Sequence, residues 1–320
     1  MKILDNCQWV PRWVTHLGCI KGCLNHLGIE MTDAWLFGGT GHAFVINVHE
    51  GVCPSGPTAW NTGRIFELGR NLGYRTDGFF ASKDQPDFAE KQEAAWNQVR
   101  QAIDGGIPCY GWELEIPEFY VVYGYDDVGY YFSGPGCDSG KGPKPWQELA
   151  DTGIGVLEMY SVQPGEAASD RETVKQALVF ALRVAGNPSD WIFEGYRAGL
   201  AGYDNWIGAL EAGTASDMGT RYNAGLWLEC RRNAVGFLKE ARERLPGAAD
   251  TLFDQAAAHY GVVAAGLARV EQIYPWSHET SDEAVLPVDD TGAAAIDALK
   301  AARAAEEAGL QTLGEIIQSL

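Results

Sequence analysis

The sequence predicts an α+β protein in which a mixed head is followed by an all-helical half. The first half of the 320 residues is rich in glycine, proline and aromatic residues and has short apolar runs of strand length. The second half is rich in alanine, leucine and charged residues, and its apolar residues recur at helical intervals. The two parts are expected to meet in the Pro- and Gly-containing segment SVQPGEAAS, which gives predicted domains at 1–165 and 166–320.

In the head, helices are expected before a run of closely spaced strands. Gly28 and Gly73 are expected to end helices at 19–27 and 58–72, because glycine commonly follows the last residue of a helix. A third helix is expected at 85–104. The predicted strands are 43–49, 74–80, 107–114, 119–125, 129–133 and 155–162. Helices followed by an antiparallel meander are typical of an α+β domain with an antiparallel sheet.

The second half is expected to form a bundle of four or five helices. Pro246, Pro275 and Pro287 separate the apolar patterns, since proline breaks a helix interior. The clearest predicted helices are 171–184, 191–212, 222–244, 248–273 and 291–320. Their apolar stripes exceed what one narrow bundle needs, so the sequence also allows a homodimer.

Composition argues against several classes of function. Lys and Arg total 24 against 43 Asp and Glu, which gives a net charge of −19 and disfavours both nucleic-acid and anionic-membrane binding. No apolar run reaches the roughly 20 residues that cross a bilayer. The N-terminal segment lacks the pattern of a secretory signal, and the seven cysteines are odd in number. Reduced thiols in a cytoplasmic protein are therefore expected.

Cys19 is the candidate nucleophile. Gly18 and Cys19 are expected to open a helix, and the first turn of a helix favours the reactive thiolate. The alternative is that Cys19 and Cys23, one helical turn apart, are small buried core residues. No CxxC pair or second Cys/His pair accompanies them, so no metal site is expected.

The segment WLFGGTGHAF, which runs from Trp35 to Phe44, is the densest glycine run. It lacks the strand–helix context of a dinucleotide fingerprint and the lysine of a P-loop, so no cofactor is expected. His42 is the preferred base for Cys19, with His16 and His49 as alternatives. An equally simple interpretation is that His42 only hydrogen-bonds within a tight loop.

Acidic and aromatic residues alternate in WELEIPEFY. Trp112, Glu113 and Glu118 can line a pocket for a cationic or polyhydroxy small molecule, and Trp35 is assigned to substrate binding with them. The alternative is that the carboxylates are solvated on a strand face while the aromatic side chains pack inward.

Two blocks of sequence carry a resemblance to a known family. HLGCIKGCLNHLGIEMTDAWLFGGTGHAF resembles the start of proteins similar to butirosin-biosynthesis protein H, and GIPCYGWELEIPEFYVVYGYDDVGYYFSGPG resembles their central sheet. The resemblance covers roughly 8–162 and implies a head related to papain-like, bacteriocin-processing cysteine peptidases. It also implies Cys19 as the nucleophile and acyl transfer from a carrier-protein thioester to an amine.

The chain departs from this family pattern at two places. Glu118 or Phe119 stands where the pattern has histidine, and Ser133-Gly134-Pro135 stands where it has Asp-Pro. The leading hypothesis is a cysteine-dependent acyltransferase or amide hydrolase for a small molecule, with His42 as base and Glu113 or Glu118 orienting that base or binding a substrate amine. The second hypothesis is a catalytically degenerate papain-like protein that serves as a small-molecule-binding or scaffold protein.

Overall fold

The computed structural model describes residues 1–247, 249–277, 280–281 and 283–320. The chain divides into two compact units. Unit 1 comprises Met1–Thr32 and Gly73–Ala167, and unit 2 comprises Asp33–Leu72 and Ala168–Leu320. The predicted mixture of helices with an antiparallel sheet, followed by a helical C-terminal region, is confirmed.

Unit 1 is built on an antiparallel sheet, which has seven strands in the described part of the chain. The strands are β1 (Lys2–Ile3), β3 (Tyr74–Ser82), β4 (Cys109–Trp112), β5 (Phe119–Tyr125), β6 (Gly129–Ser133), β7 (Lys141–Pro145) and β8 (Val156–Pro164). Their order is β3-β8-β4-β5-β6-β7, and β1 pairs with β5. β1 and β7 were not predicted, because the first has only two residues and the second contains two prolines.

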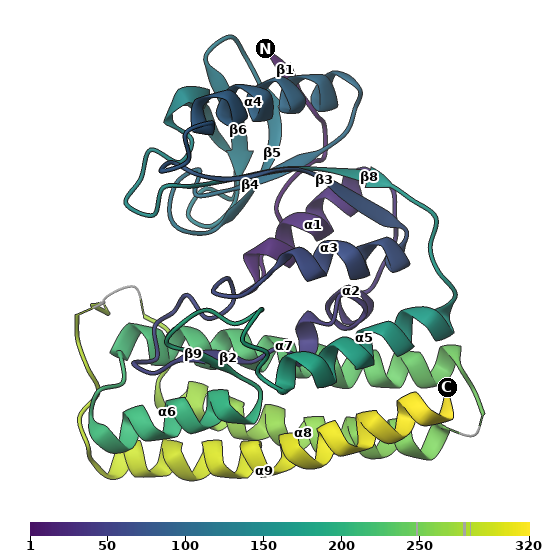
Figure 1. Cartoon of the computed structure of the whole chain (residues 1–320), viewed down its shortest axis with the longest axis vertical. Helices are drawn as coiled ribbons and strands as arrows, with labels where there is room; N and C mark the ends of the chain where they lie inside the picture. The colour runs from purple at the N-terminus through teal and green to yellow at the C-terminus, as the bar shows by residue number, and fades with distance from the viewer. Residues whose placement is uncertain (248, 278–279, 282) are drawn as a thin grey trace. The chain divides into compact units, whose positions relative to one another are not determined.

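Two helices cover the faces of this sheet. Figure 1 shows α1 (Thr15–His26) on one side and α4 (Phe88–Asp104) on the other. The buried side chains of α4 recur at three- and four-residue intervals and include Trp96, Val99 and Ile103, as expected for a helix with one face on a sheet.

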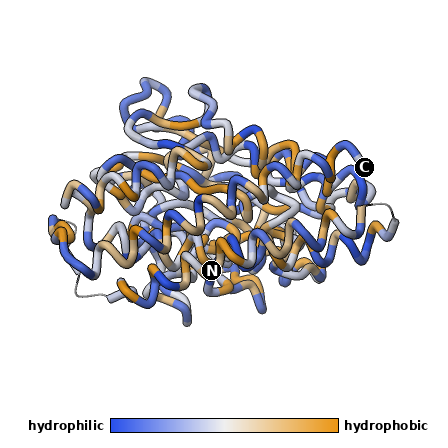
Figure 2. The backbone as a smooth tube through the Cα atoms, turned by 90° about the horizontal axis from the view of Figure 1, so that it is seen from below, coloured by the Kyte–Doolittle hydropathy of each residue, from blue (hydrophilic) through white to orange (hydrophobic). Residues whose placement is uncertain are grey.

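Unit 2 is mainly helical. Its helices are α2 (Asp33–Gly39), α3 (Gly63–Gly69), α5 (Asp170–Ala185), α6 (Leu200–Ala212), α7 (Asp217–Arg244), α8 (Asp250–Ile273) and α9 (Asp290–Ser319). The three longest, α7, α8 and α9, form consecutive packed pairs. Polar and apolar residues alternate along the long helices, as Figure 2 shows, which is typical of amphipathic helices with one buried face. A two-stranded ribbon of β2 (Asn47–His49) and β9 (Tyr196–Ala198) completes the unit.

The segment 33–72 belongs to unit 2, whereas the sequence placed it in the head. Gly38 of α2 lies so close to α7 that a Cβ there would come within 2.0 Å of the Phe237 ring. Arg231 of α7 donates hydrogen bonds to the carbonyl oxygens of Ala43 at 2.9 Å and Val45 at 2.7 Å. These partners are far apart in the sequence, so a local pattern does not reveal them.

Several predicted elements have different bounds. The helix expected at 19–27 begins at Thr15, and the helix expected at 58–72 is reduced to α3 and a 3-10 turn at Arg70–Leu72. The helix expected at 191–212 begins only at Leu200, because Gly195 and Gly199 adopt positive φ angles of 80° and 62° around β9. Of the strand expected at 43–49, only Asn47–His49 forms a strand, β2. The helix expected at 248–273 starts at a residue outside the described ones, and α8 begins at Asp250.

A fully enclosed ion pair joins α7 to α9. Nε of Arg231 donates to Glu306 at 2.7 Å and Nη2 donates to the other carboxylate oxygen at 3.0 Å. The side chains are 0% and 1% exposed, and Tyr203 of α6 donates to Glu306 at 3.1 Å. Burial opposes the charge on Arg231, but the Glu306 carboxylate together with Tyr203 and Tyr260 outweighs it, so the pKa of the guanidinium is raised.

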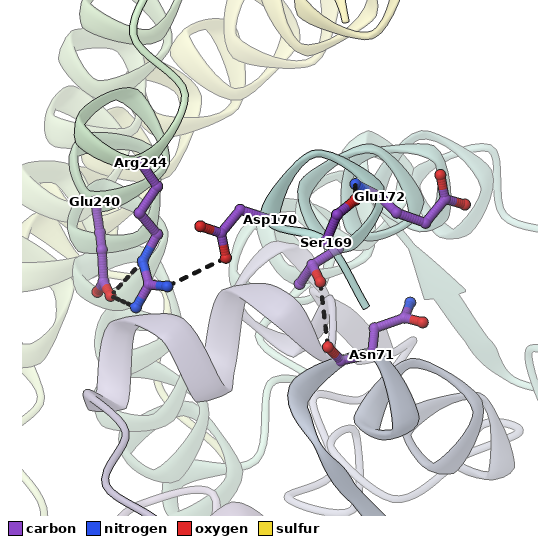
Figure 3. A network of polar contacts seen from close by, with 7 residues as sticks. Asn71, Ser169, Asp170, Glu172, Glu240 and Arg244 are labelled. Carbon is purple, nitrogen blue, oxygen red and sulfur yellow. Dashed lines mark hydrogen bonds and ion pairs between the residues drawn. The ribbon is translucent and has the colours of Figure 1, made fainter. Parts of the chain in front are cut away.

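A second polar network joins α5 to α7 near the surface. Figure 3 shows Arg244 between Glu240 and Asp170, with contacts of 2.7 and 3.2 Å. Ser169 caps α5 by accepting a hydrogen bond from the backbone N–H of Glu172 at 3.3 Å, which satisfies one of the unpaired donors of the first turn. Because these side chains are partly exposed, the network is expected to stabilise the fold less than the enclosed pair.

We expect Glu306→Gln to lower the free energy of unfolding by about 3–5 kcal/mol, because it leaves the Arg231 charge buried without a counter-charge. The measurement is urea denaturation followed by circular dichroism. Asp204→Asn is the matched control, since Arg303 and Asp204 also join α9 to α6 at 2.7 Å but are 31% and 55% exposed. That change should cost less than about 1 kcal/mol. Equal losses in the two variants would contradict the prediction.

Candidate functional site

Cys19 lies inside the core of unit 1. It is the fifth residue of α1, not the first, and its side chain is 0% exposed. Burial raises the pKa of the Cys19 thiol well above its usual value, and the Glu118 carboxylate adds to the shift. The thiol is therefore held protonated, which is the unreactive form.

Cys19 belongs to a cluster of enclosed thiols. Cys7, Cys23 and Cys109 are each exposed by 1% or less, and Cys23 donates to the carbonyl oxygen of Cys109 at 3.7 Å. Electrostatic interactions with Cys7, Cys19 and Cys109 add to burial in raising the pKa of Cys23. These contacts correspond to the second interpretation of the Cys19/Cys23 spacing, in which free cysteines act as small core residues.

His42, the predicted base, lies in unit 2 rather than in the unit that contains Cys19. Its Nδ1 is 3.6 Å from the sulfur of Cys230 on α7, and both side chains are buried. Burial, together with the nearby Arg231 charge, lowers the pKa of His42 to about 4. The neutral ring can accept a hydrogen bond from the protonated Cys230 thiol. No motif near His42 pointed to this partner.

His16 and His49, the two alternative candidates for the base, also have hydrogen-bond partners other than Cys19. Nε2 of His16 lies 2.9 Å from the hydroxyl of Tyr110, and the ring stacks on Phe119 with 4.3 Å between centroids. Nδ1 of His49 accepts a hydrogen bond from the backbone N–H of Gly51 at 3.0 Å, and its ring packs against Tyr196.

Three of the predicted substrate-binding residues come together at the hairpin that joins β4 to β5. Trp112 pairs with Phe119 across the hairpin, and the N–H of Glu113 donates to the carbonyl of Glu118 at 2.8 Å. Glu113 is 5% exposed and has a positive φ of 58°, a conformation that costs energy in a residue other than glycine. Its carboxylate accepts a hydrogen bond from the Thr152 hydroxyl at 2.7 Å.

The first turn of α1 meets this hairpin through Thr15, which sequence reasoning missed. Its Oγ1 donates to the Glu118 carboxylate at 2.5 Å and accepts a hydrogen bond from the N–H of Phe119 at 3.3 Å. We call Thr15, Trp112, Glu113 and Glu118 the α1–hairpin site. Thr15 contacts Glu118 and Phe119 through its side chain, and Glu113 contacts Glu118 through a backbone hydrogen bond. The feature of the sequence that pointed to this place was the family pattern, which has its catalytic histidine where this chain has Glu118 or Phe119.

Trp35, the fourth predicted substrate-binding residue, lies in unit 2 and not at the α1–hairpin site. The guanidinium carbon of Arg244 lies 3.9 Å from the centroid of its ring, and the Phe237 ring packs against it at 5.3 Å. Because Trp35 is only 6% exposed, these contacts make it a packing residue between α2 and α7.

No set of three or more His, Cys, Asp or Glu side chains in the described residues is arranged to hold a metal ion. None of the described helices combines the length and the apolar character that crossing a membrane requires. No family model matches the chain. No curated protein matches it either.

We expect acid to destabilise the protein through His42. An unfolded histidine takes up a proton near pH 6.5, whereas the folded His42 does so only near pH 4. The unfolded state therefore binds more protons in this window, and stability falls by up to about 3 kcal/mol as pH drops from 6.5 to 4. His42→Asn should remove this part of the pH dependence in urea denaturation. His259→Asn, a change at a half-buried histidine of α8, is the control and should leave the slope intact.

Proposed function

We propose that the chain is a papain-like protein without cysteine catalysis that binds a small cationic molecule at the α1–hairpin site. The observation that carries this proposal is the complete burial of the Cys19 side chain, which also raises the pKa of its thiol. A nucleophilic cysteine requires access and a stabilised thiolate, and Cys19 has neither.

The packing of α1 supports the papain-like interpretation. α1 lies against β4, β5 and β8 of the antiparallel sheet. The start of α1 touches the start of β5, where this chain has Glu118 or Phe119 in place of the histidine of the family pattern. Thr15 donates a hydrogen bond to the Glu118 carboxylate there, at 2.5 Å.

Thr15 and Glu118 are suited to binding rather than to nucleophilic catalysis. A threonine hydroxyl is a weak nucleophile unless a positioned general base takes its proton. A carboxylate does bind cations well, and hydrogen bonds to charged groups contribute about 1.5–3 kcal/mol. Trp112 and Phe119 belong to the same hairpin as the two carboxylates, so the site combines the residue types that select an organic amine.

We expect Cys19 to resist iodoacetamide in the folded protein at neutral pH. The half-exposed Cys53 and Cys137 should react first, whereas Cys19 should be modified only after unfolding. Mass spectrometry of the digested protein identifies the labelled cysteines. Selective labelling of Cys19 at mildly acidic to neutral pH would instead support the cysteine-enzyme hypothesis and overturn this proposal.

We expect 1,4-diaminobutane to bind saturably in isothermal titration calorimetry. Glu118→Gln and Glu113→Gln should each weaken binding by roughly tenfold or more, because each removes a negative charge that faces the amine.

Glu115→Gln is the matched control for this titration. Glu115 lies in the same hairpin, but its carboxylate is partly exposed and pairs with Lys141 at 2.6 Å. Its removal should leave the affinity unchanged. A diamine that does not bind, or a loss in Glu115→Gln equal to those at the site, would show that the carboxylates of the α1–hairpin site do not recognise amines.

A further inference from the structure

Two arginines of unit 2 converge on one tryptophan. The guanidinium carbons of Arg183 and Arg64 lie 4.3 and 4.9 Å from the centroid of the Trp191 ring. Arg64 comes from α3, and Arg183 comes from the last turn of α5. Trp191 is 4% exposed and stacks on Phe180 of α5 with 5.5 Å between centroids. Stacking on Phe180 therefore fixes the position of the Trp191 ring that the two guanidinium groups contact.

Two N–H donors in this cluster are enclosed and have no acceptor among the described residues. They are Nε of Arg64 and Nε1 of Trp191. An enclosed donor without a partner costs about 1–3 kcal/mol, and native structures retain few of them. Since Nε is bonded to the guanidinium carbon, it lies within about 6 Å of the ring centroid. Nε1 is an atom of the same indole ring, so the two donors are separated by roughly 8 Å or less, which two oxygens of one tetrahedral anion can span through hydrogen bonds of ordinary length.

The carboxylates that already pair with the arginines are exposed. Nη1 of Arg64 contacts Glu67 at 2.8 Å, and Nη2 of Arg183 lies 3.7 Å from Asp190. The Glu67 and Asp190 side chains are 60% and 67% exposed, and ion pairs of this kind contribute at most about 1 kcal/mol. An incoming anion can therefore compete for the two guanidinium groups, each of which carries five N–H donors.

We propose that Arg64, Arg183 and Trp191 form a binding site for a phosphate-type oxyanion, either as the free ion or as the terminal group of a small molecule. Arg64 Nε and Trp191 Nε1 donate to the anion, and the second guanidinium supplies charge and further donors. Paired arginines suit this task because their planar forks match the oxygens of phosphate. The site is separate from the α1–hairpin site and does not depend on the function proposed for it.

The test is a titration of the full chain with sodium phosphate at constant ionic strength, followed in proton–nitrogen correlation spectra. The cross-peak of the Trp191 indole N–H is identified as the one that is missing in Trp191→Phe. We expect it to shift saturably, with a dissociation constant of about 1 mM or below. Arg64→Gln and Arg183→Gln should each weaken binding roughly tenfold. Methyl phosphate distinguishes the two forms of the anion: equal binding indicates a terminal phosphate group, and binding of inorganic phosphate alone indicates the free ion.

Arg242→Gln is the matched control. Arg242 is another arginine of unit 2 that pairs with an exposed carboxylate, Asp254 at 3.2 Å, and it should have no effect on phosphate binding. The remaining indole cross-peaks show whether each variant keeps the native fold. A Trp191 peak that stays in place up to roughly 100 mM phosphate overturns the proposal. Equal weakening in Arg242→Gln also overturns it, because binding would then depend on general charge.

Discussion

The enclosed contact between Arg231 and Glu306 constrains more of unit 2 than any other polar interaction described above. Removing two charges from water costs several kcal/mol per ion, and only complete pairing offsets this cost. Arg231 donates to Glu306 and to the carbonyl oxygens of Ala43 and Val45, so α7, α9 and the 3-10 turn at His42–Phe44 must adopt one mutual arrangement. This arrangement buries His42 beside Cys230, and the same arginine helps to lower the pKa of His42.

The cost of burying a charge also determines whether the Cys19 thiol ionises. The positive end of a helix favours a thiolate by about 0.3–1 kcal/mol, and the effect falls off within the first turn. Full burial can shift a pKa by several units in the opposite direction, and one unit corresponds to 1.36 kcal/mol. Cys19 lies beyond the first turn and is completely enclosed, so burial prevails. Thr15 holds the favourable end of the helix, but its hydroxyl gains little there because it does not ionise near neutral pH.

Sequence reasoning succeeded where neighbouring residues determine the structure. The β4–β5 hairpin brings Trp112, Glu113 and Glu118 together because a short connection fixes the register of its strands. The start of α1 was missed because Val14 supplies no side-chain cap before the helix. The position of His42 was missed for a different reason: its partner Cys230 lies 188 residues away, and no local pattern encodes such a contact.

The two proposed sites bind ligands of opposite charge, an amine and a phosphate, on a chain with a net charge of −19. An overall negative field attracts amines to many surface positions, so amine binding alone does not identify the α1–hairpin site. The site is identified by the difference in amine affinity between Glu118→Gln and Glu115→Gln. The same field repels phosphate, so an anion binds only where local donors overcome that repulsion. Salt screens the field over about 10 Å but acts much less on enclosed hydrogen bonds. Moderate ionic strength should therefore suppress nonspecific amine binding while it weakens the long-range repulsion of phosphate from the Arg64–Arg183 cluster.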